Sequence, residues 1–224
     1  MSAFGLKIIA IITMIIDHLG YAIFGEFSFF NYIGRIAFPI FAFQISEGYI
    51  HTKDLKKYFL RLFLFAIISQ IPFMLFHSII SDQFYLNIFF TLLLGLLSIY
   101  VYDKCKYKIL GIFLAFIFAS IAQITKCDYG FFGVSIILIF YIFKSDIIKA
   151  DIFFIIATLL KYIIPCIKYN VFPHEYLYLF LGTSFSAIFL TLYNGKKGKN
   201  TKYLLYMFYP IHLILLYGIY LILK

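Results

Sequence analysis

The chain has 224 residues, of which 64% are hydrophobic and 13% charged, and its mean hydropathy is +0.98. Soluble domains are about 45–50% apolar and about 25% charged, so this composition excludes a soluble enzyme, a secreted disulfide scaffold and a disordered chain. The formal charge of +9 does not indicate nucleic-acid binding, because basic residues in membrane proteins mark cytoplasmic loops and contact anionic lipids. We therefore expect an integral membrane protein.

Nine apolar segments are candidates for membrane-spanning helices, since a helix needs about 20 residues to cross a bilayer. They are 6–24, 33–50, 58–77, 86–102, 108–124, 129–143, 148–166, 175–192 and 203–222. The connections between them are short. The prediction is an all-α, polytopic membrane helix bundle that forms a single domain over residues 1–224.

Proline interrupts several of these segments. The X-Pro steps lie at Pro39, Pro72, Pro165 and Pro210. Proline lacks the N–H that a preceding carbonyl would accept, so we expect helix breaks there, in places where protein or water satisfies the freed carbonyls.

The distribution of charge predicts the orientation. With the N-terminus in the cytoplasm, fourteen of the 19 Lys and Arg residues fall on the inner side, as the positive-inside rule requires. The five exceptions are Arg35, Lys126, Lys161, Lys168 and Lys224. We predict an N-in, C-out topology and interpret the basic run 196–199 as a cytoplasmic anchor.

The first segment carries ionisable residues, which are costly inside a membrane and suggest a function. His18 follows Lys7 by eleven residues, so both lie on one helix face about 16 Å apart. This spacing suits a long anionic ligand whose phosphates stay near Lys7 while its reactive end reaches His18. Asp17 is turned about 100° from His18 and could orient a partner or pair with a cation from another helix. The alternative is a structural histidine bonded to a carbonyl.

The second segment has a polar face in its cytoplasmic half. Gln44, Glu47, Gly48 and His51 share this face and lead into Lys53, Lys56, Lys57 and Arg61. The spacing of Glu47 and His51 could suit a metal ion, but a third ligand is lacking, so we expect no metal.

Other segments send polar groups toward one layer in the middle to outer membrane. These residues are Arg35, Ser69, Gln70, Asn87, Asp128 and His212. Any one of them alone could be structural, and Arg35 could instead extend to the outer headgroups. Their convergence on one layer predicts a cavity.

Several strings identify a family resemblance. LKIIAIITMIIDHLG, RIAFPIFAFQISEGYIHTKDLKKYFLRLF, ISQIPF, NIFFTLLLGLL and DYGFFGV run in order through residues 6–134, and YPIHL follows near the C-terminus. They resemble the TraX family, whose named member is associated with N-terminal acetylation of conjugative pilin. That family is similar to the membrane-bound acyltransferases of family three, in which a basic residue, ten others and a histidine lie in the first helix. Lys7 and His18 fit this pattern, with Lys where Arg is common.

The resemblance implies an acyltransferase in the bacterial cytoplasmic (inner) membrane, with acetyl-CoA as co-substrate. It would O- or N-acetylate an acceptor peptide or glycan in the membrane or at its outer face. His18 would be the catalytic base or a covalent acetyl carrier, assisted by Asp17. Donor binding would fall to Lys7, Glu47, His51, Lys53, Lys56, Lys57 and Arg61. The acceptor or oxyanion side would involve Arg35, Ser69, Gln70, Asn87, Asp128 and His212.

Two other functions remain open from the sequence. The same polar layer would serve a small transporter or flippase, although no inverted repeat of the kind common in transporters is visible. A structural membrane protein without chemistry would have no need for the buried ionisable groups. The expected partners are membrane lipids and the acceptor, without nucleic acid.

Overall fold

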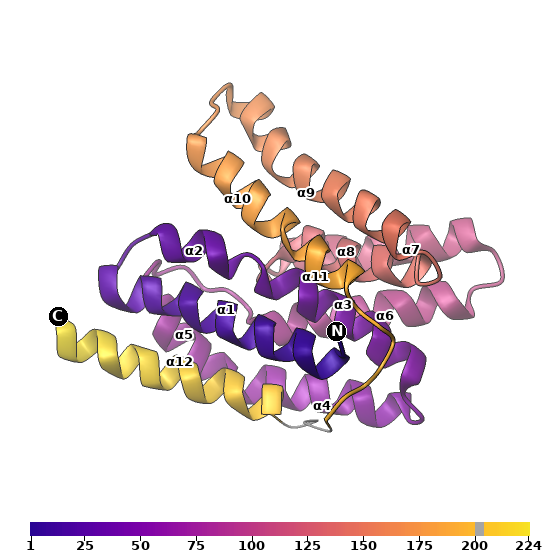
Figure 1. Ribbon diagram of the computed structural model, residues 1–224, viewed down its shortest axis with the longest axis horizontal. Coiled ribbons are helices and arrows are strands. Elements are labelled where there is room, and N and C mark those ends of the chain that lie inside the picture. The colour runs from indigo at the N-terminus through magenta and orange to yellow at the C-terminus, as the bar shows by residue number, and fades with distance from the viewer. Residues whose placement is uncertain (200–203) are drawn as a thin grey trace.

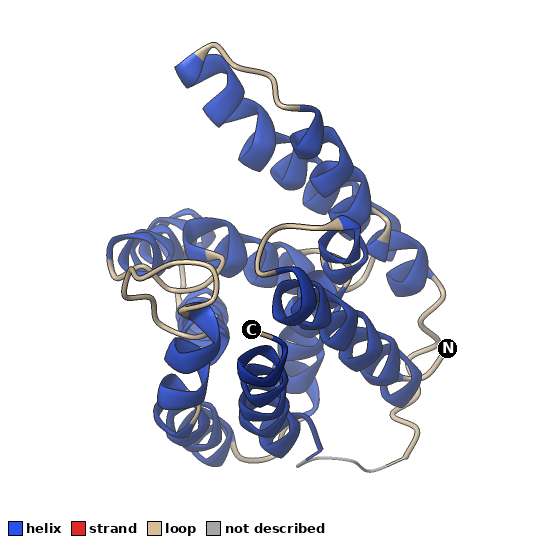
Figure 2. Cartoon of the chain, turned by 90° about the vertical axis from the view of Figure 1, so that its left-hand side faces the viewer, coloured by secondary structure: helices blue, strands red, loops and turns tan. Residues whose placement is uncertain are grey.

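The computed structural model of the chain describes residues 1–199 and 204–224, and Figure 1 shows these residues as a bundle of helices. The helices are α1 (Ala3–Phe24), α2 (Phe29–Gly34), α3 (Ala37–His51), α4 (Leu55–Ile68), α5 (Gln70–His77), α6 (Ile88–Lys104), α7 (Lys108–Ile124), α8 (Gly130–Ile142), α9 (Ile147–Tyr169), α10 (His174–Ser184), α11 (Ser186–Thr191) and α12 (Leu204–Leu223). Within this described part the chain forms no strand (Figure 2), and the β contact is an isolated bridge between Leu86 and Cys127. The predicted all-α class is confirmed.

Each of the nine predicted segments coincides with a helix or with two consecutive helices, although position 203 lies outside the described residues. Among the described residues, three helices are long and apolar enough to cross a membrane: α1, α9 and α12. A fourth span results if α4 and α5, which are bent by 44°, are taken together. These helices support a membrane protein, whereas the count of nine spans and the N-in, C-out orientation stay predictions.

Two of the four expected proline breaks are present. Pro72 cannot donate to the Ile68 carbonyl, and α4 ends at that residue. Pro39 lies in the first turn of α3, where its missing N–H costs little. The chain breaks just before α3, between Gly34 and Ala37.

The other two expected breaks are wrong. Pro165 and Pro210 lie inside α9 and α12, which continue through them. Each proline removes a single backbone hydrogen bond, and neighbouring groups in a helix bundle can satisfy the freed carbonyl.

Helix α3 is the centre of the molecule. Ten of its 15 residues are buried, and it packs against α1, α6, α8 and α11. A helix that is apolar on all sides needs neighbours on all sides, which explains why the string AFPIFAF ends in the core.

Helices α9 and α10 pack together and extend away from the rest of the bundle in both views (Figure 1 and Figure 2). Helices α1, α3, α4, α5, α6 and α12 line two cavities. The fold therefore places the interior polar groups between α3 and the α1, α5 and α12 helices.

Candidate functional site

Two cavities lie end to end along α1. The histidine cavity, of about 280 Å³, is lined by Asp17, His18, Arg35 and Asp128 among others. The basic cavity, of about 690 Å³, is lined by Lys7 and by four further lysines. Phe41, Phe89 and Leu92 line both cavities, so the cavities adjoin at these three side chains, which we call the neck. A ligand that extends from one cavity into the other would pass these three side chains.

His18 is held by a second histidine from α12. The His18 Nδ1 and His212 Nε2 atoms are 2.8 Å apart, and the His212 Nδ1 atom is 2.9 Å from the Phe208 carbonyl oxygen. Because a carbonyl can only accept, the neutral His212 carries its proton on Nδ1 and accepts on Nε2. His18 must then donate from Nδ1, which leaves its Nε2 atom with a free lone pair. The His18 Nε2 atom, on the side of the ring away from His212, can therefore accept a proton.

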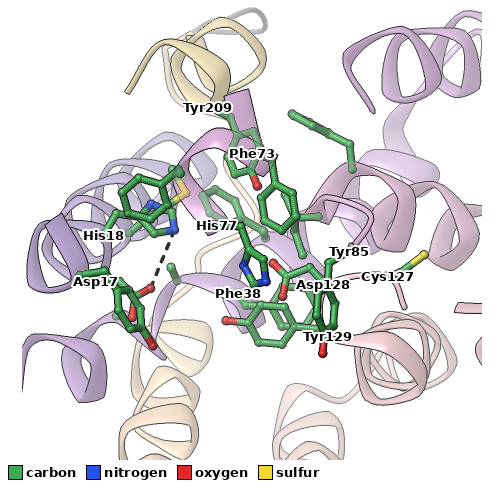
Figure 3. A pocket seen from close by; sticks show the side chains of 18 of the residues that line it. Asp17, His18, Phe38, Phe73, His77, Tyr85, Cys127, Asp128, Tyr129 and Tyr209 are labelled. Carbon is green, nitrogen blue, oxygen red and sulfur yellow. Dashed lines mark ion pairs between the residues drawn. The ribbon is translucent and has the colours of Figure 1, made fainter. Parts of the chain in front are cut away.

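The free nitrogen of His18 faces Asp17. The His18 Nε2 and Asp17 Oδ2 atoms are 3.9 Å apart, as the dashed line in Figure 3 marks. The Arg35 Nη2 group donates to Asp17 Oδ1 (3.0 Å), and its Nε group donates to the Asn31 carbonyl (3.1 Å). Asp17 therefore pairs with a cation from outside its own helix, as the sequence suggested. It is also placed to stabilise positive charge on His18.

A glycine permits this ion pair. A Cβ atom on Gly34 would lie 2.2 Å from the Asp17 side chain, closer than any real contact, so only glycine lets α2 approach α1 at this point. Without this approach the Asp17 carboxylate would be displaced from Arg35.

The far wall of the histidine cavity contributes further polar groups (Figure 3). Asp128 lines it, and the backbone carbonyl of Asp128 accepts a hydrogen bond from Thr91. His77 also lines it, and its buried Nε2 atom has no hydrogen-bond partner among the described residues. The wall thus adds an acid and an imidazole with an unpartnered nitrogen to a cavity lined mainly by apolar side chains.

The basic cavity has an excess of positive charge. Its lining includes six Lys and Arg side chains, Lys7, Lys53, Lys57, Arg61, Lys197 and Lys199, against the carboxylates Glu47 and Asp54. The Tyr193 hydroxyl donates to Glu47 (2.9 Å), and the His51 Nε2 atom is 3.5 Å from it. Such a surface is suited to a polyanion.

Asp54 is the second acid of the basic cavity, and it caps α4. The Lys57 backbone N–H donates to its carboxylate (2.9 Å), which lowers the pKa of Asp54 below its ordinary value. The Lys57 ammonium lies 3.2 Å from the same carboxylate. Asp54 therefore stays ionised at neutral pH and neutralises part of the charge of Lys57.

The structure brings most of the predicted site residues to the two cavities. The donor-side residues Lys7, Glu47, His51, Lys53, Lys57 and Arg61 all line the basic cavity, whereas Lys56 does not. Asp17, His18, Arg35 and Asp128 line the histidine cavity, and His212 contacts it through His18.

Three predicted residues lie elsewhere. Ser69, Gln70 and Asn87 line neither cavity. The Asn87 side chain donates to Gln70 (2.8 Å) and to the Ala66 carbonyl (2.7 Å), and it caps α6. These residues join α4, α5 and α6 at the break, away from the histidine cavity.

The sequence reasoning missed several lining residues. The basic run 196–199, predicted to be a cytoplasmic anchor, places Lys197 and Lys199 in the wall of the basic cavity with Tyr193. The only signal was their polarity, because the N-terminal segment that positions them is about 190 residues away in sequence. No group of three or more His, Cys, Asp or Glu side chains that could hold a metal occurs in the described part of the chain.

Comparisons with known proteins show which family and which relatives this chain resembles. A family model described as TraX protein matches residues 2–220. The chain is 30% identical over 232 residues to the "Probable fimbrial assembly protein FimC, serogroup H1" of Dichelobacter nodosus, which covers 96% of this chain and 94% of that protein. It is also 35% identical over 98 residues to an uncharacterized protein of Rickettsia prowazekii, covering 43% of this chain and 36% of that one. No solved structure matches the chain.

Proposed function

The chain belongs to the TraX family, and on that premise we propose that it is a membrane-embedded acyltransferase that moves an acetyl group from acetyl-CoA to an acceptor. The transfer would occur at His18, in the histidine cavity. The acceptor would be a peptide or glycan in the membrane or at its outer face. The family, the helical fold and the apolar helices that can cross a membrane support this proposal.

The observation that carries the proposal is the neck shared by the two cavities. The basic cavity suits the phosphates of a coenzyme A donor, and Lys7 lies about 16 Å from His18 along α1. An extended pantetheine arm is of about this length. A donor with its phosphates beside Lys7 would thus pass Phe41, Phe89 and Leu92 and present its thioester to His18.

The proposed chemistry uses the free lone pair of His18. The Nε2 atom takes the proton of the acceptor hydroxyl or amine as that atom attacks the thioester carbonyl. Arg35 is the candidate donor to the oxyanion of the tetrahedral intermediate, and Asp17 stabilises the imidazolium. Collapse expels the thiolate of coenzyme A, which takes the proton back from His18. An acetyl-histidine intermediate is the covalent variant of this scheme.

The acceptor and the topology complete the proposal. Since the relative from Dichelobacter nodosus is named for fimbrial assembly, a pilin-like peptide is the first acceptor to test, with a glycan second. We propose nine spans in the bacterial cytoplasmic membrane with the N-terminus inside. In this orientation the basic cavity opens to the cytoplasm, where acetyl-CoA is made.

Release of free coenzyme A by the purified protein tests the proposal. The protein in detergent or nanodiscs is given acetyl-CoA with a pilin-derived peptide, a membrane glycan or neither, and thiol release is followed. Acceptor-dependent release that needs His18 supports the proposal. If acetyl-CoA neither binds nor turns over with any acceptor, the proposal is wrong.

A transporter or flippase is the second candidate, because two adjoining cavities that share lining residues would also suit a transport path. Polar and ionisable groups line both of them, as in transport pathways. Movement of a labelled substrate across proteoliposomes in the absence of acetyl-CoA would favour this function. Acetyl transfer without such movement would exclude it.

A further inference from the structure

The segment 193–199, between α11 and α12, closes one side of the basic cavity. It carries Lys197 and Lys199 into the cavity wall, and both side chains are exposed. Its position raises the question of which part of an anionic ligand it would contact.

Backbone hydrogen bonds fix this segment against the start of the chain. The Ala3 N–H donates to the Lys196 carbonyl (2.8 Å), and the Phe4 N–H donates to the Lys197 carbonyl (3.1 Å). The Asn194 N–H donates to the Met1 carbonyl (2.9 Å). The lysines are therefore carried by an ordered backbone rather than by a free loop.

Two glycines shape the segment. Gly195 and Gly198 have φ angles of 72° and 71°, in the left-handed region that favours glycine. A Cβ atom on Gly198 would lie 2.7 Å from the Ser2 hydroxyl and 2.9 Å from the Phe4 Cβ atom, whereas one on Gly195 would meet nothing within 4 Å. Gly198 is thus the point where the segment packs closely on the N-terminal residues.

The cations of the basic cavity lie at two levels. Lys7 and Arg61 are partly buried, whereas Lys197 and Lys199 are exposed at the rim. The buried Nε atom of Arg61 has no hydrogen-bond partner among the described residues, and its guanidinium lies 5.5 Å from the centre of the Tyr58 ring. A guanidinium that lines the cavity and is held over an aromatic ring is suited to a phosphate group.

We propose that the basic cavity contains two phosphate subsites, and that segment 193–199 forms the outer one. Given the donor proposed above, Lys7 and Arg61 bind the diphosphate next to the pantetheine arm. Lys197 and Lys199 bind the phosphate monoester on the ribose, which carries about two negative charges at neutral pH. The segment then distinguishes coenzyme A from its dephosphorylated form.

Binding of coenzyme A and of 3′-dephospho-coenzyme A to the purified full-length chain tests this, because neither measurement needs an acceptor. The wild type should bind coenzyme A about tenfold more tightly than 3′-dephospho-coenzyme A. The K197A/K199A variant should bind both compounds within about twofold of each other, with affinity close to that of the wild type for the dephosphorylated form. K104A/K106A, which removes the same charge from the end of α6 and the loop after it, outside both cavities, is the matched control and should keep the tenfold preference.

Glycine variants separate the position of the segment from its charge. Gly198→Ala should weaken the preference for coenzyme A, because the added Cβ displaces the segment from Ser2 and Phe4. Gly195→Ala has the same backbone strain without this clash and should weaken the preference less. Equal effects of the two variants would contradict the role of the packed segment.

The outcomes distinguish this inference from the proposed function. If the wild type binds coenzyme A and K197A/K199A keeps the full preference for it, the outer subsite is wrong and the acyltransferase proposal stands. If the wild type does not bind coenzyme A at all, both are wrong. Circular dichroism of each variant verifies that the helices are retained.

Discussion

The histidine cavity and the basic cavity differ in how their polar groups are held. In the histidine cavity, His18 is bonded to His212, and Arg35 is bonded to both Asp17 and Asn31. In the basic cavity, Lys53, Lys197 and Lys199 are exposed, and the Nε atom of Arg61 has no partner among the described residues. One cavity has fixed geometry, and the other has available charge.

This difference corresponds to two physical demands. A proton transfer needs groups held in one geometry and one tautomer, which only buried partners can provide. Binding of phosphates needs cations whose charge is not already neutralised. We therefore expect changes in the histidine cavity to alter kcat and changes in the basic cavity to alter donor affinity.

The largest effect should come from His18→Ala. Loss of the base should lower kcat by about 10²- to 10⁴-fold, while the affinity for coenzyme A stays unchanged because His18 does not line the basic cavity. Thiol release from acetyl-CoA measures kcat, and calorimetry measures the affinity for coenzyme A. His174→Ala, at an exposed position outside both cavities, should have wild-type activity. Full activity of His18→Ala would remove this residue from the mechanism.

Leu92→Trp tests whether the two cavities work through the neck. Leu92 is 3% exposed and lines both cavities. The indole ring of tryptophan should therefore block the pantetheine arm of the donor and lower kcat by about 10²-fold. Coenzyme A binding at the phosphate end should persist, which also verifies that this variant folds. Leu92→Met conserves volume and serves as the control. Normal transfer by Leu92→Trp would mean that the donor takes another route.

His212 variants test the tautomer argument. His212→Leu leaves His18 Nδ1 without its acceptor, and we expect kcat to fall by about tenfold or more with unchanged donor affinity. His212→Gln retains an acceptor oxygen and should recover part of the loss. The pH profile of kcat should shift in His212→Leu and return toward the wild type in His212→Gln. Identical profiles for both variants would indicate a purely structural role.

The smallest effect should come from Asp54→Asn. This change removes a negative charge 3.2 Å from Lys57, while asparagine still caps α4, so donor affinity should rise by about two- to fivefold. Because the pKa of Asp54 is lowered by the hydrogen bond from the Lys57 N–H, the carboxylate stays charged at neutral pH and down to more acidic pH than an ordinary Asp, whose pKa is about 4. The gain should thus be constant at neutral pH and disappear only as acid protonates Asp54.

Asp146→Asn is the matched control for this prediction. Asp146 caps α9 through the Lys149 N–H (3.1 Å) and pairs with the Lys149 ammonium (3.1 Å), but it lines neither cavity. Its substitution should leave donor affinity unchanged. An equal gain from both substitutions would indicate a general effect of net charge.

The sequence predicted the polar groups better than their partners. The spacing of Lys7 and His18 on one helix face follows from local geometry, and the structure places them in adjoining cavities. The contact of His18 with His212 joins residues 194 positions apart, and no local pattern contains it. The same holds for Lys197, which depends on pairing with Phe4.

Single polar residues and prolines in the sequence were weaker guides to the site and to helix breaks. Gln70 and Asn87 were expected near the acceptor, but they satisfy each other at the break between α4 and α5. A polar residue at membrane depth must find a partner, and a nearby helix break supplies one as readily as a functional site does. Pro165 and Pro210 were likewise expected to interrupt helices that tertiary packing keeps continuous.

The central claim is that the histidine cavity determines kcat and the basic cavity determines donor affinity. Parallel measurements of kcat, KM for acetyl-CoA and coenzyme A affinity on His18→Ala and Arg61→Ala test it most directly. We expect His18→Ala to bind coenzyme A normally and to lose kcat. Arg61→Ala should keep most of its kcat at saturating donor and lose affinity for coenzyme A by about tenfold or more. Loss of kcat in both variants, or loss of affinity in both, would contradict separate roles for the two cavities.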